Sequence, residues 1–207
     1  MKLKQLILLL SITIGFSSLS FASRYNLDRA HMSVGFSIKH LVISNVNGRF
    51  DNFEGHFNFD PKKGELTGIE AKINLDSINT NETKRDAHLR GPDFFGTRDK
   101  KGKLKPKNQY MTFKSTKVVN RGKKPTKVTG MLTLNGKTKP VALDVEYKGA
   151  VTDPWGTNKV VFVATGEIKR KDFGLTYNKA LETGGLVIGE KVKISIEGEA
   201  NEQKAKK

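Results

Sequence analysis

A two-residue period in the hydrophobic pattern constrains this chain more than any other feature. In segments 32–40, 69–76 and 141–148, apolar residues alternate with polar or small ones, which is typical of strands with one apolar face. Similar rows lie at 46–59, 110–119, 128–134, 160–168 and 192–196. About eight strands without crossover helices predict an all-β fold with antiparallel pairing. Eight such strands can close into a barrel that is filled by side chains or holds one small ligand.

Turn residues mark where several of these strands end. Asn135-Gly136 lies between two alternating segments and is the strongest short-range signal for a hairpin. Asp60-Pro61 ends another row. The apolar parity reverses across Asp51-Asn52, so we expect a β-bulge or a tight bend there.

Small residues in the inward rows favour a barrel with an internal cavity. They are Gly35 or its neighbours, Gly48, Gly55, Ala71, Ala164 and Gly166. A core filled by its own side chains would use bulkier residues at these positions. The alternative is a filled barrel in which the glycines relieve strand curvature.

The stretch Asn79–Phe95 departs from the two-residue period and predicts a short helix. Asn79-Thr80-Asn81 offers good N-cap residues, and Gly91-Pro92 stops the helix. Leu89, Phe94 and Phe95 then supply apolar side chains. We interpret the stretch as a lid that closes one end of the barrel; the alternative is a plain connection whose apolar residues join the core.

The first 22 residues have the features of a cleaved signal peptide. Lys2 and Lys4 precede the apolar run Leu6–Phe16, which is short for a transmembrane helix. Small residues end this segment, so we expect cleavage after Ala22 and export, the alternative being an uncleaved anchor. The remaining chain is long enough for one domain, which we place at 23–200, followed by a basic tail at 201–207 that we expect to be disordered.

The charge is strongly basic, at +16, and loss of Lys2 and Lys4 lowers it to +14. Export argues against a nucleic-acid partner and leaves anionic envelope components as partners for this charge. From Arg98 to Lys127 the sequence holds twelve Lys or Arg residues against one acid, Asp99. This segment predicts a basic surface patch, with a solvated loop and strand edge as the alternative. The chain has no cysteine, so disulfide bonds and a lipid-modified cysteine are excluded.

Five separated segments resemble the YceI-like family of polyisoprenoid-binding proteins. They are YNLDRAHMSVGFSIKHL, SINTNETKRDAHLRGPDFF, VTGMLTLNGKTKPVALDVEYKG, IKRKDFGL and VKISIEGEA. The resemblance covers about residues 24–200. The resemblance implies an eight-stranded antiparallel lipocalin-like barrel in the periplasm that encloses a polyisoprenoid such as a quinone or prenyl pyrophosphate. It implies no enzymatic activity and no cofactor, and it implies a homodimer. The lysine-rich insert Thr97–Asn108 departs from the family pattern, where a short turn follows the Phe-Phe pair.

Inward parity and the lid supply the candidate binding residues. The apolar candidates are Phe36, Ile38, Phe50, Phe57, Ile73, Leu89, Phe94, Phe95, Phe113, Leu132, Leu143, Phe162 and Ile194. The candidates for contact with a polar head group are Arg85, His88, Arg170 and His40. For the arginines the alternative is structural: buried Arg85–Asp86 and Arg170–Asp172 pairs that fix the loops.

Catalytic and metal motifs are absent from the sequence. GxSxG, HExxH and P-loop patterns do not occur, and the four histidines lack ligand spacing. We therefore expect no metal site and a binding function: transport or storage of a long amphiphilic lipid in the barrel. The alternative is a surface-binding envelope protein that uses the Arg98–Lys127 patch, with the barrel as scaffold; an enzyme with an isoprenoid substrate is the least favoured hypothesis.

Overall fold

A computed structural model describes residues 22–180 and 186–204. The strands are β1 (Ser23–His40), β2 (Ser44–Phe50), β3 (Phe53–Asp60), β4 (Glu65–Asn74), β5 (Ile78–Asn79), β6 (Tyr110–Arg121), β7 (Lys124–Leu134), β8 (Lys137–Thr152), β9 (Asn158–Lys169) and β10 (Ile188–Glu202). One α-helix within the described residues, α1 (Thr83–Arg90), lies between β5 and β6. Short 3-10 turns cover Leu75–Ser77, Pro106–Asn108 and Arg170–Phe173.

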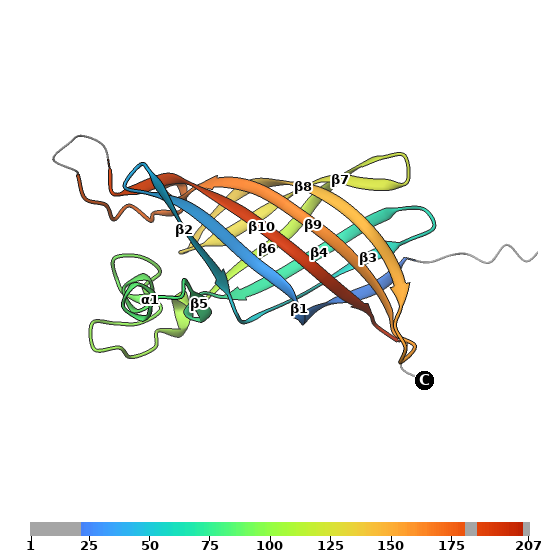
Figure 1. Ribbon diagram of the computed structural model, residues 1–207, viewed down its shortest axis with the longest axis horizontal. Coiled ribbons are helices and arrows are strands. Elements are labelled where there is room, and N and C mark those ends of the chain that lie inside the picture. Colours follow the sequence, from blue (N-terminus) through green and yellow to red (C-terminus); the bar gives the residue numbers. More distant parts are fainter. Residues whose placement is uncertain (1–21, 181–185, 205–207) are drawn as a thin grey trace, which may run out of the picture.

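The strands form one closed antiparallel barrel (Figure 1). Neighbours follow in the order β10-β9-β8-β7-β6-β4-β3-β1-β2-β5, and β1 also pairs with β10, which closes the sheet. β2 and β3 pair with successive parts of β1, 35–40 and 23–26, so they form one long strand with a bend. Counted this way the barrel has eight strands, which confirms the predicted fold class.

The bend at Asp51-Asn52 and the hairpin at Asn135-Gly136 were both predicted correctly. Phe50 and Phe53 flank the bend and are each 7% exposed, whereas an unbroken strand would turn one of them outward. Asn135 and Gly136 have φ values of 51° and 70°, the left-handed backbone that a two-residue hairpin between β7 and β8 requires.

The barrel end remote from α1 is plugged by aromatic side chains. Phe59 is fully buried, with its ring centroid 5.0 Å from Tyr147 and 5.1 Å from Phe162. Tyr25 stacks on Phe57 at 5.7 Å. Large rings from β1, β3, β8 and β9 therefore meet across the barrel axis. They fill this end of the barrel with the protein's own side chains.

Tyr25 in this plug should make the fold sensitive to alkaline pH. Burial first, and then the nearby carboxylate of Glu202, raise its pKa to about 12, so the fold favours the neutral phenol. This stabilisation is present below pH 10 and is lost as the pH rises toward 12. The loss amounts to about 3 kcal/mol in the free energy of unfolding. Denaturant titrations from pH 7 to 12 should show that Tyr25→Phe is as stable as the parent at pH 7 and loses less stability above pH 10; parallel curves would contradict this.

The predicted domain limits need one adjustment. β10 continues through Asn201 to Glu202, because Glu202 pairs with Tyr25 and accepts a hydrogen bond from Asn158. The predicted tail therefore begins later than residue 201, and its last residues, 205–207, lie outside the described residues. The predicted signal peptide also lies outside them, apart from Ala22. In the described part of the chain, no helix has the length and apolar character needed to cross a membrane.

Candidate functional site

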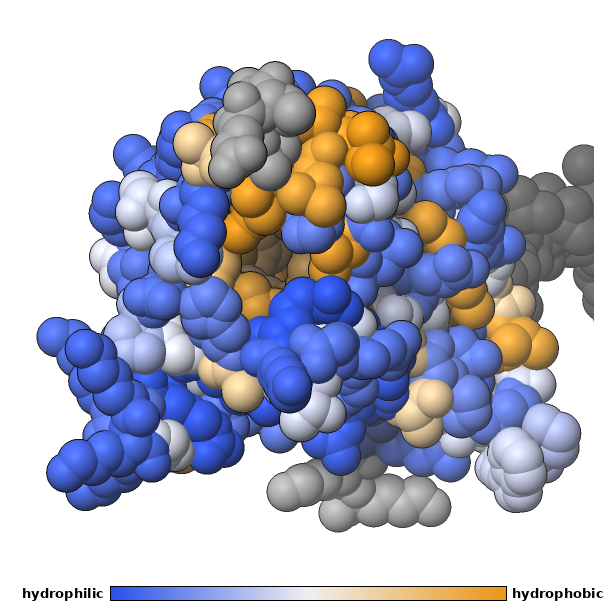
Figure 2. Space-filling view, turned by 60° about the vertical axis from the view of Figure 1, so that its left-hand side comes forward, coloured by the Kyte–Doolittle hydropathy of each residue, from blue (hydrophilic) through white to orange (hydrophobic). Residues whose placement is uncertain are grey.

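The barrel encloses an apolar cavity of about 530 Å³, within the range that small-molecule sites occupy. The plug forms its floor, since Phe57 and Phe162 line it. Figure 2 shows the other end, where a hollow with hydrophobic walls opens between polar rims. Figure 2 brings forward the left-hand side of Figure 1, where α1 lies, so the cavity is a tube with a mouth on the side of α1.

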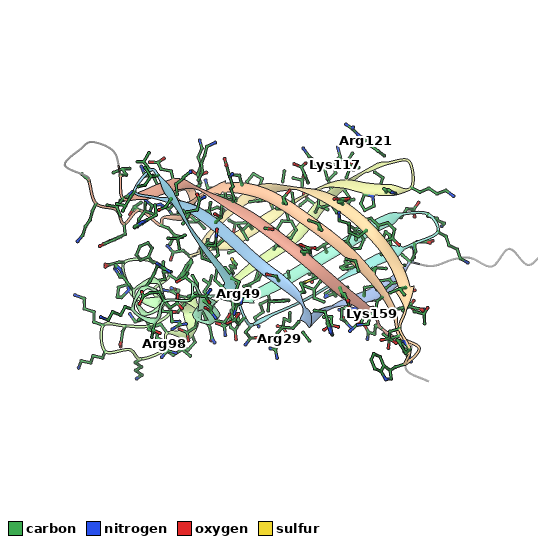
Figure 3. The ribbon with its side chains drawn as sticks, in the orientation of Figure 1. Arg29, Arg49, Arg98, Lys117, Arg121 and Lys159 are labelled. Atoms are coloured by element: carbon green, nitrogen blue, oxygen red, sulfur yellow. The ribbon has the colours of Figure 1, made fainter. Side chains whose placement is uncertain are left out.

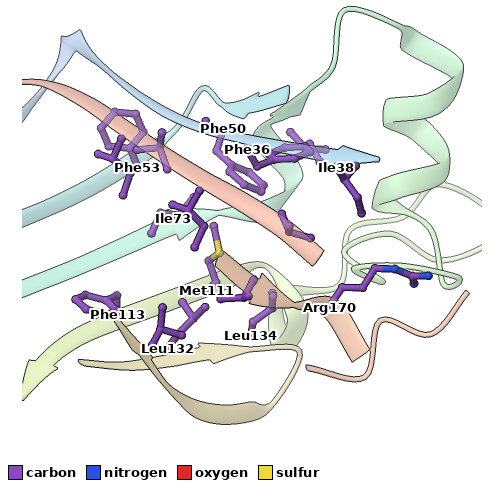
Figure 4. A pocket seen from close by; sticks show the side chains of 18 of the residues that line it. Phe36, Ile38, Phe50, Phe53, Ile73, Met111, Phe113, Leu132, Leu134 and Arg170 are labelled. Carbon is purple, nitrogen blue, oxygen red and sulfur yellow. The ribbon is translucent and has the colours of Figure 1, made fainter. Parts of the chain in front are cut away.

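All thirteen apolar and all four polar candidate residues from the sequence line this cavity. Several of the apolar ones are seen in Figure 4, where Phe36, Ile73 and Leu132 come from different strands around the same space. Their role in ligand binding stays a prediction. Phe53, Met111 and Tyr177 also line the cavity, although they are not among the candidates from the sequence. Phe53 and Met111 lie in alternating rows, whereas Tyr177 follows the last 3-10 turn and carries no periodic signal.

Three of the small inward residues do not leave space in the cavity, contrary to prediction. A Cβ atom at Gly48 would lie 2.4 Å from the Phe36 ring, and one at Gly166 would lie 2.7 Å from the Leu143 side chain. A Cβ atom at Gly55 would lie 2.6 Å from the carbonyl oxygen of Glu70 and 2.9 Å from the Leu27 side chain. Neighbouring groups therefore fill the space at these glycines, while Ala71 and Ala164 do line the cavity. Gly35 borders the cavity, but a Cβ atom there would face the Ser33 hydroxyl and the carbonyl oxygens of Ser195 and Gly48, so it is not an inward position.

The α1 segment is fastened to the barrel through Thr80. Asp86 is buried and accepts hydrogen bonds from the Thr80 amide at 2.9 Å and from its hydroxyl at 2.5 Å. Arg85 donates to the hydroxyl and carbonyl oxygens of the same threonine. Arg85 therefore has a structural role beside Asp86, although the predicted direct ion pair is not found among the described residues.

The helix begins later than the sequence suggested. Glu82 is the N-cap, and its carboxylate accepts hydrogen bonds from the amides of Lys84 and Arg85. The predicted caps Asn79, Thr80 and Asn81 precede it, because Thr80 is used to bind Asp86 instead. Gly91 ends the helix as predicted.

A second set of contacts holds the start of the lysine-rich insert against Asp76. Arg98 donates to both Asp76 carboxylate oxygens, at 2.8 and 2.6 Å, and the buried Thr97 hydroxyl donates to one of them. Burial alone would raise the pKa of Asp76, but these hydrogen bonds hold it below its ordinary value. The insert is thus joined to the barrel rim at its first residues.

Aromatic rings from two separate segments meet at the mouth. His88 on α1 lies 5.1 Å from Phe94 and 5.0 Å from Tyr177, centroid to centroid, and Phe94 lies 5.0 Å from Tyr177. His88 Nε2 is also 2.9 Å from Asp93 Oδ2. The rings cover part of the mouth, as expected of a lid segment, and leave the hollow seen in Figure 2. His40 lines the cavity at the end of β1.

Arg170 is buried at the α1 end of the cavity. Figure 4 shows its guanidinium beyond the apolar side chains. Its nitrogens donate to the carbonyl oxygens of Gly189, Leu175 and Tyr177, but Nη2 has no partner among the described residues. The predicted Arg170–Asp172 pair is likewise not found there. Burial lowers the pKa of this guanidinium, which nevertheless stays charged, as arginine does in proteins.

The predicted Arg98–Lys127 patch is divided between two parts of the surface. Figure 3 places Arg98 near the α1 end, and Lys117 and Arg121 toward the other end of the barrel. The segment runs through the insert and then along β6 into β7, so its cations are separated by a strand's length. Lys114 and Lys127 are also paired, with Glu70 and Asp144. The segment therefore does not form one continuous basic surface.

One group of side chains has the spacing of metal ligands. Atoms of Asp28, His31 and Glu199 lie within 4.8 Å of one another. The Lys159 ammonium donates hydrogen bonds to the carboxylates of Glu199, at 2.8 Å, and Asp28, at 3.2 Å. The ammonium supplies the positive charge that a metal ion would otherwise supply between these carboxylates. The group is therefore an ion-pair cluster. Burial would raise the pKa of Asp28, but hydrogen bonds from His31, Asn201 and Lys159 hold it well below its usual range.

A closed antiparallel barrel with an apolar tube open at one end defines a barrel-type ligand-binding protein. Residues 25–200 match the model of the YceI-like domain, and the chain belongs to the YceI-like family. A UPF0312 protein of Staphylococcus epidermidis is 37% identical over 180 residues, which cover 86% of this chain and 96% of that protein.

Solved structures agree with this assignment. The crystal structure of the Campylobacter jejuni YceI protein has a TM-score of 0.67 at 36% identity, covering 86% of this chain and 97% of that one. A polyisoprenoid binding domain from Saccharophagus degradans has a TM-score of 0.58 at 16% identity, covering 88% and 99%. The second likeness extends to the fold alone.

Proposed function

We propose that this protein binds a long amphiphilic lipid, most closely a polyisoprenoid, with the tail in the barrel and the head group at the mouth. The observation that carries this proposal is the apolar tube of about 530 Å³, with aromatic side chains as its floor and a mouth on the side of α1. A tube of this shape suits a linear apolar chain better than a compact ligand. The fold shared with the Saccharophagus degradans polyisoprenoid binding domain supports the ligand class.

The tail supplies most of the binding free energy. Each buried methylene-sized group contributes about 0.8 kcal/mol, so each five-carbon isoprene unit contributes roughly 4 kcal/mol before the costs of ordering the chain. One charge-assisted hydrogen bond contributes about 1.5–3 kcal/mol. The tube therefore sets affinity, and the polar groups at the mouth select among head groups.

Extraction of the purified protein with organic solvent, followed by mass spectrometry, tests the proposal. A polyisoprenoid should be recovered in a constant ratio to protein from a host that makes prenylated lipids. A matched extraction of the Ala71→Phe/Ala164→Phe variant, in which two rings enter the tube, controls for lipid carried on the surface. Repeated recovery of no lipid, together with no binding of added prenyl compounds, would remove the proposal.

Arg170 should favour an anionic head group. Its free Nη2 is a buried donor that a phosphate oxygen at the mouth can satisfy. We expect geranylgeranyl pyrophosphate to bind about tenfold or more tighter than geranylgeraniol, a difference that corresponds to one charge-assisted hydrogen bond. Arg170→Lys should reduce this ratio. The ratio is measured by competition against a fluorescent prenyl probe, and it is insensitive to a partial folding defect; an unchanged ratio contradicts the assignment of Arg170.

Export, assembly and the lack of catalysis belong to the same proposal. Cleavage after Ala22 predicts Ser23 as the first residue of the mature protein, which N-terminal sequencing of the periplasmic fraction checks.

The family resemblance predicts a homodimer, which sedimentation checks. A lipid carrier or store should return its ligand chemically unchanged after long incubation; conversion of a prenyl pyrophosphate to product would favour an enzyme instead.

A further inference from the structure

The tip of the β1–β2 hairpin is apolar and exposed. Leu41, Val42 and Ile43 are 39%, 63% and 85% exposed. Leu41 and Val42 also have left-handed backbone, with φ values of 51° and 66°. This conformation is a genuine outlier for a β-branched residue, since glycine or asparagine would adopt it more easily. Local stability therefore does not explain why the tip carries three large apolar side chains in succession.

The tip is continuous with the mouth of the cavity. The Leu41 amide donates to the carbonyl of Val187 at 2.8 Å, and Val187 lines the cavity together with Ile38. Leu186, the preceding residue, is itself 38% exposed. Figure 2 shows hydrophobic side chains gathered on the rim of the hollow. An apolar path thus runs from the protruding tip into the tube.

Free positive charge surrounds this apolar tip. Lys39 and Lys179 line the mouth, are exposed and have no ion-pair partner among the described residues. The insert after α1 lies at the same end of the barrel (Figure 1). It adds exposed lysines that are also unpaired within the described chain: Lys100, Lys101, Lys103, Lys105 and Lys107. Apolar side chains flanked by lysines match the interface of an anionic bilayer, where the acyl region is apolar and the head groups are negative.

We propose that the mouth end docks on an anionic lipid bilayer, with Leu41, Val42 and Ile43 inserted among the lipids and the lysines held at the head groups. The tube then faces the membrane, so a lipid tail passes along the apolar path without crossing water. The direction of this transfer rests on the proposed function. Bilayer docking itself does not, because it uses the outer surface of the rim.

Vesicle sedimentation with the mature protein tests the docking. The vesicles are phosphatidylcholine alone or phosphatidylcholine with phosphatidylglycerol. The parent should bind the anionic vesicles, and a Val42→Asn/Ile43→Ser variant should bind about tenfold or more weakly, because two exposed aliphatic side chains no longer insert. Asparagine tolerates the left-handed backbone at residue 42, so this variant should keep its thermal stability. The matched control is Val151→Ser/Trp155→Ser, which removes two exposed apolar side chains (59% and 83% exposed), one at the end of β8 and one in the β8–β9 turn. It should bind as the parent does.

Fluorescence reports which end meets the lipid. Trp155 is the sole tryptophan and should keep its emission when anionic vesicles are added. Ile43→Trp in a Trp155→Phe background should shift to the blue. Absence of vesicle binding by the parent, equal loss in the control variant, or a shift of Trp155 would each overturn the proposal. Lipid recovered from the Val42→Asn/Ile43→Ser variant by solvent extraction tests the tube separately, so failure of docking and failure of lipid binding remain distinguishable.

Discussion

Filling the tube should abolish lipid binding without unfolding the barrel. Ala71 on β4 and Ala164 on β9 both line the cavity, and β4 and β9 are separated by three strands in each direction around the barrel. An Ala71→Phe/Ala164→Phe variant therefore brings two rings into the space from opposite walls. Overpacking a filled core costs about 1–3 kcal/mol, but here the rings enter a void. We expect the lipid recovered per protein to fall by about tenfold or more, with the circular dichroism spectrum and melting temperature preserved.

The chain offers a matched control for this variant. Ala142 lies on β8 and is exposed, so Ala142→Phe adds the same ring to the outside of the barrel. This change should leave the recovered lipid unchanged. Undiminished lipid in the Ala71→Phe/Ala164→Phe protein would place the ligand outside the tube, and a loss in both proteins would show that the effect is not specific to the cavity.

Phe59→Ala should cause the largest loss of stability among single substitutions at the plug. The side chain is fully buried, and its ring contacts Tyr25, Tyr147 and Phe162. Truncation leaves a cavity that these rings, held on separate strands, cannot collapse to fill. We expect the free energy of unfolding to fall by about 3–5 kcal/mol in a denaturant titration.

Phe94→Ala is the comparison for this second prediction. Phe94 is half-buried at the mouth and packs against His88 and Tyr177, outside the plug. Its truncation should cost clearly less than that of Phe59, because part of the ring already contacts solvent. A loss of under about 1 kcal/mol for Phe59→Ala would mean that the plug relaxes around the missing ring, contrary to the close packing of protein interiors.

The candidate site was largely accessible from the sequence because side-chain direction in a strand is a local property. Successive side chains point to opposite faces, so parity alone placed Phe36, Ile73 and Phe113 on the inside. The same rule located the bend at Asp51-Asn52, where parity reverses. Residues without periodicity, such as Tyr177, could not be found in this way, since its position at the mouth follows from contacts with His88 and Phe94.

The free space inside the barrel was harder to predict from the sequence, because the space beside a small residue depends on the side chains of the neighbouring strands. Glycine at 48 and 166 indicated open space, but Phe36 and Leu143 lie over these positions. Which rotamer a cross-strand neighbour adopts is decided by the register of the closed barrel. The basic segment illustrates the same limit: residues close in sequence lie toward opposite ends of the molecule once β6 separates them.

The sequence by itself determined the strands, their inward faces, the hairpin at Asn135-Gly136, and the presence and end of the helix, because each depends on backbone geometry within a few residues. Only the tertiary structure decided where the barrel closes, which end is plugged by Phe59, that Arg85 and Asp86 fasten Thr80, and that the apolar tip at Leu41–Ile43 lies beside the mouth of the tube. These features require residues far apart in the chain to meet, and the free energy that selects them comes from non-local packing and hydrogen bonds that no local pattern encodes.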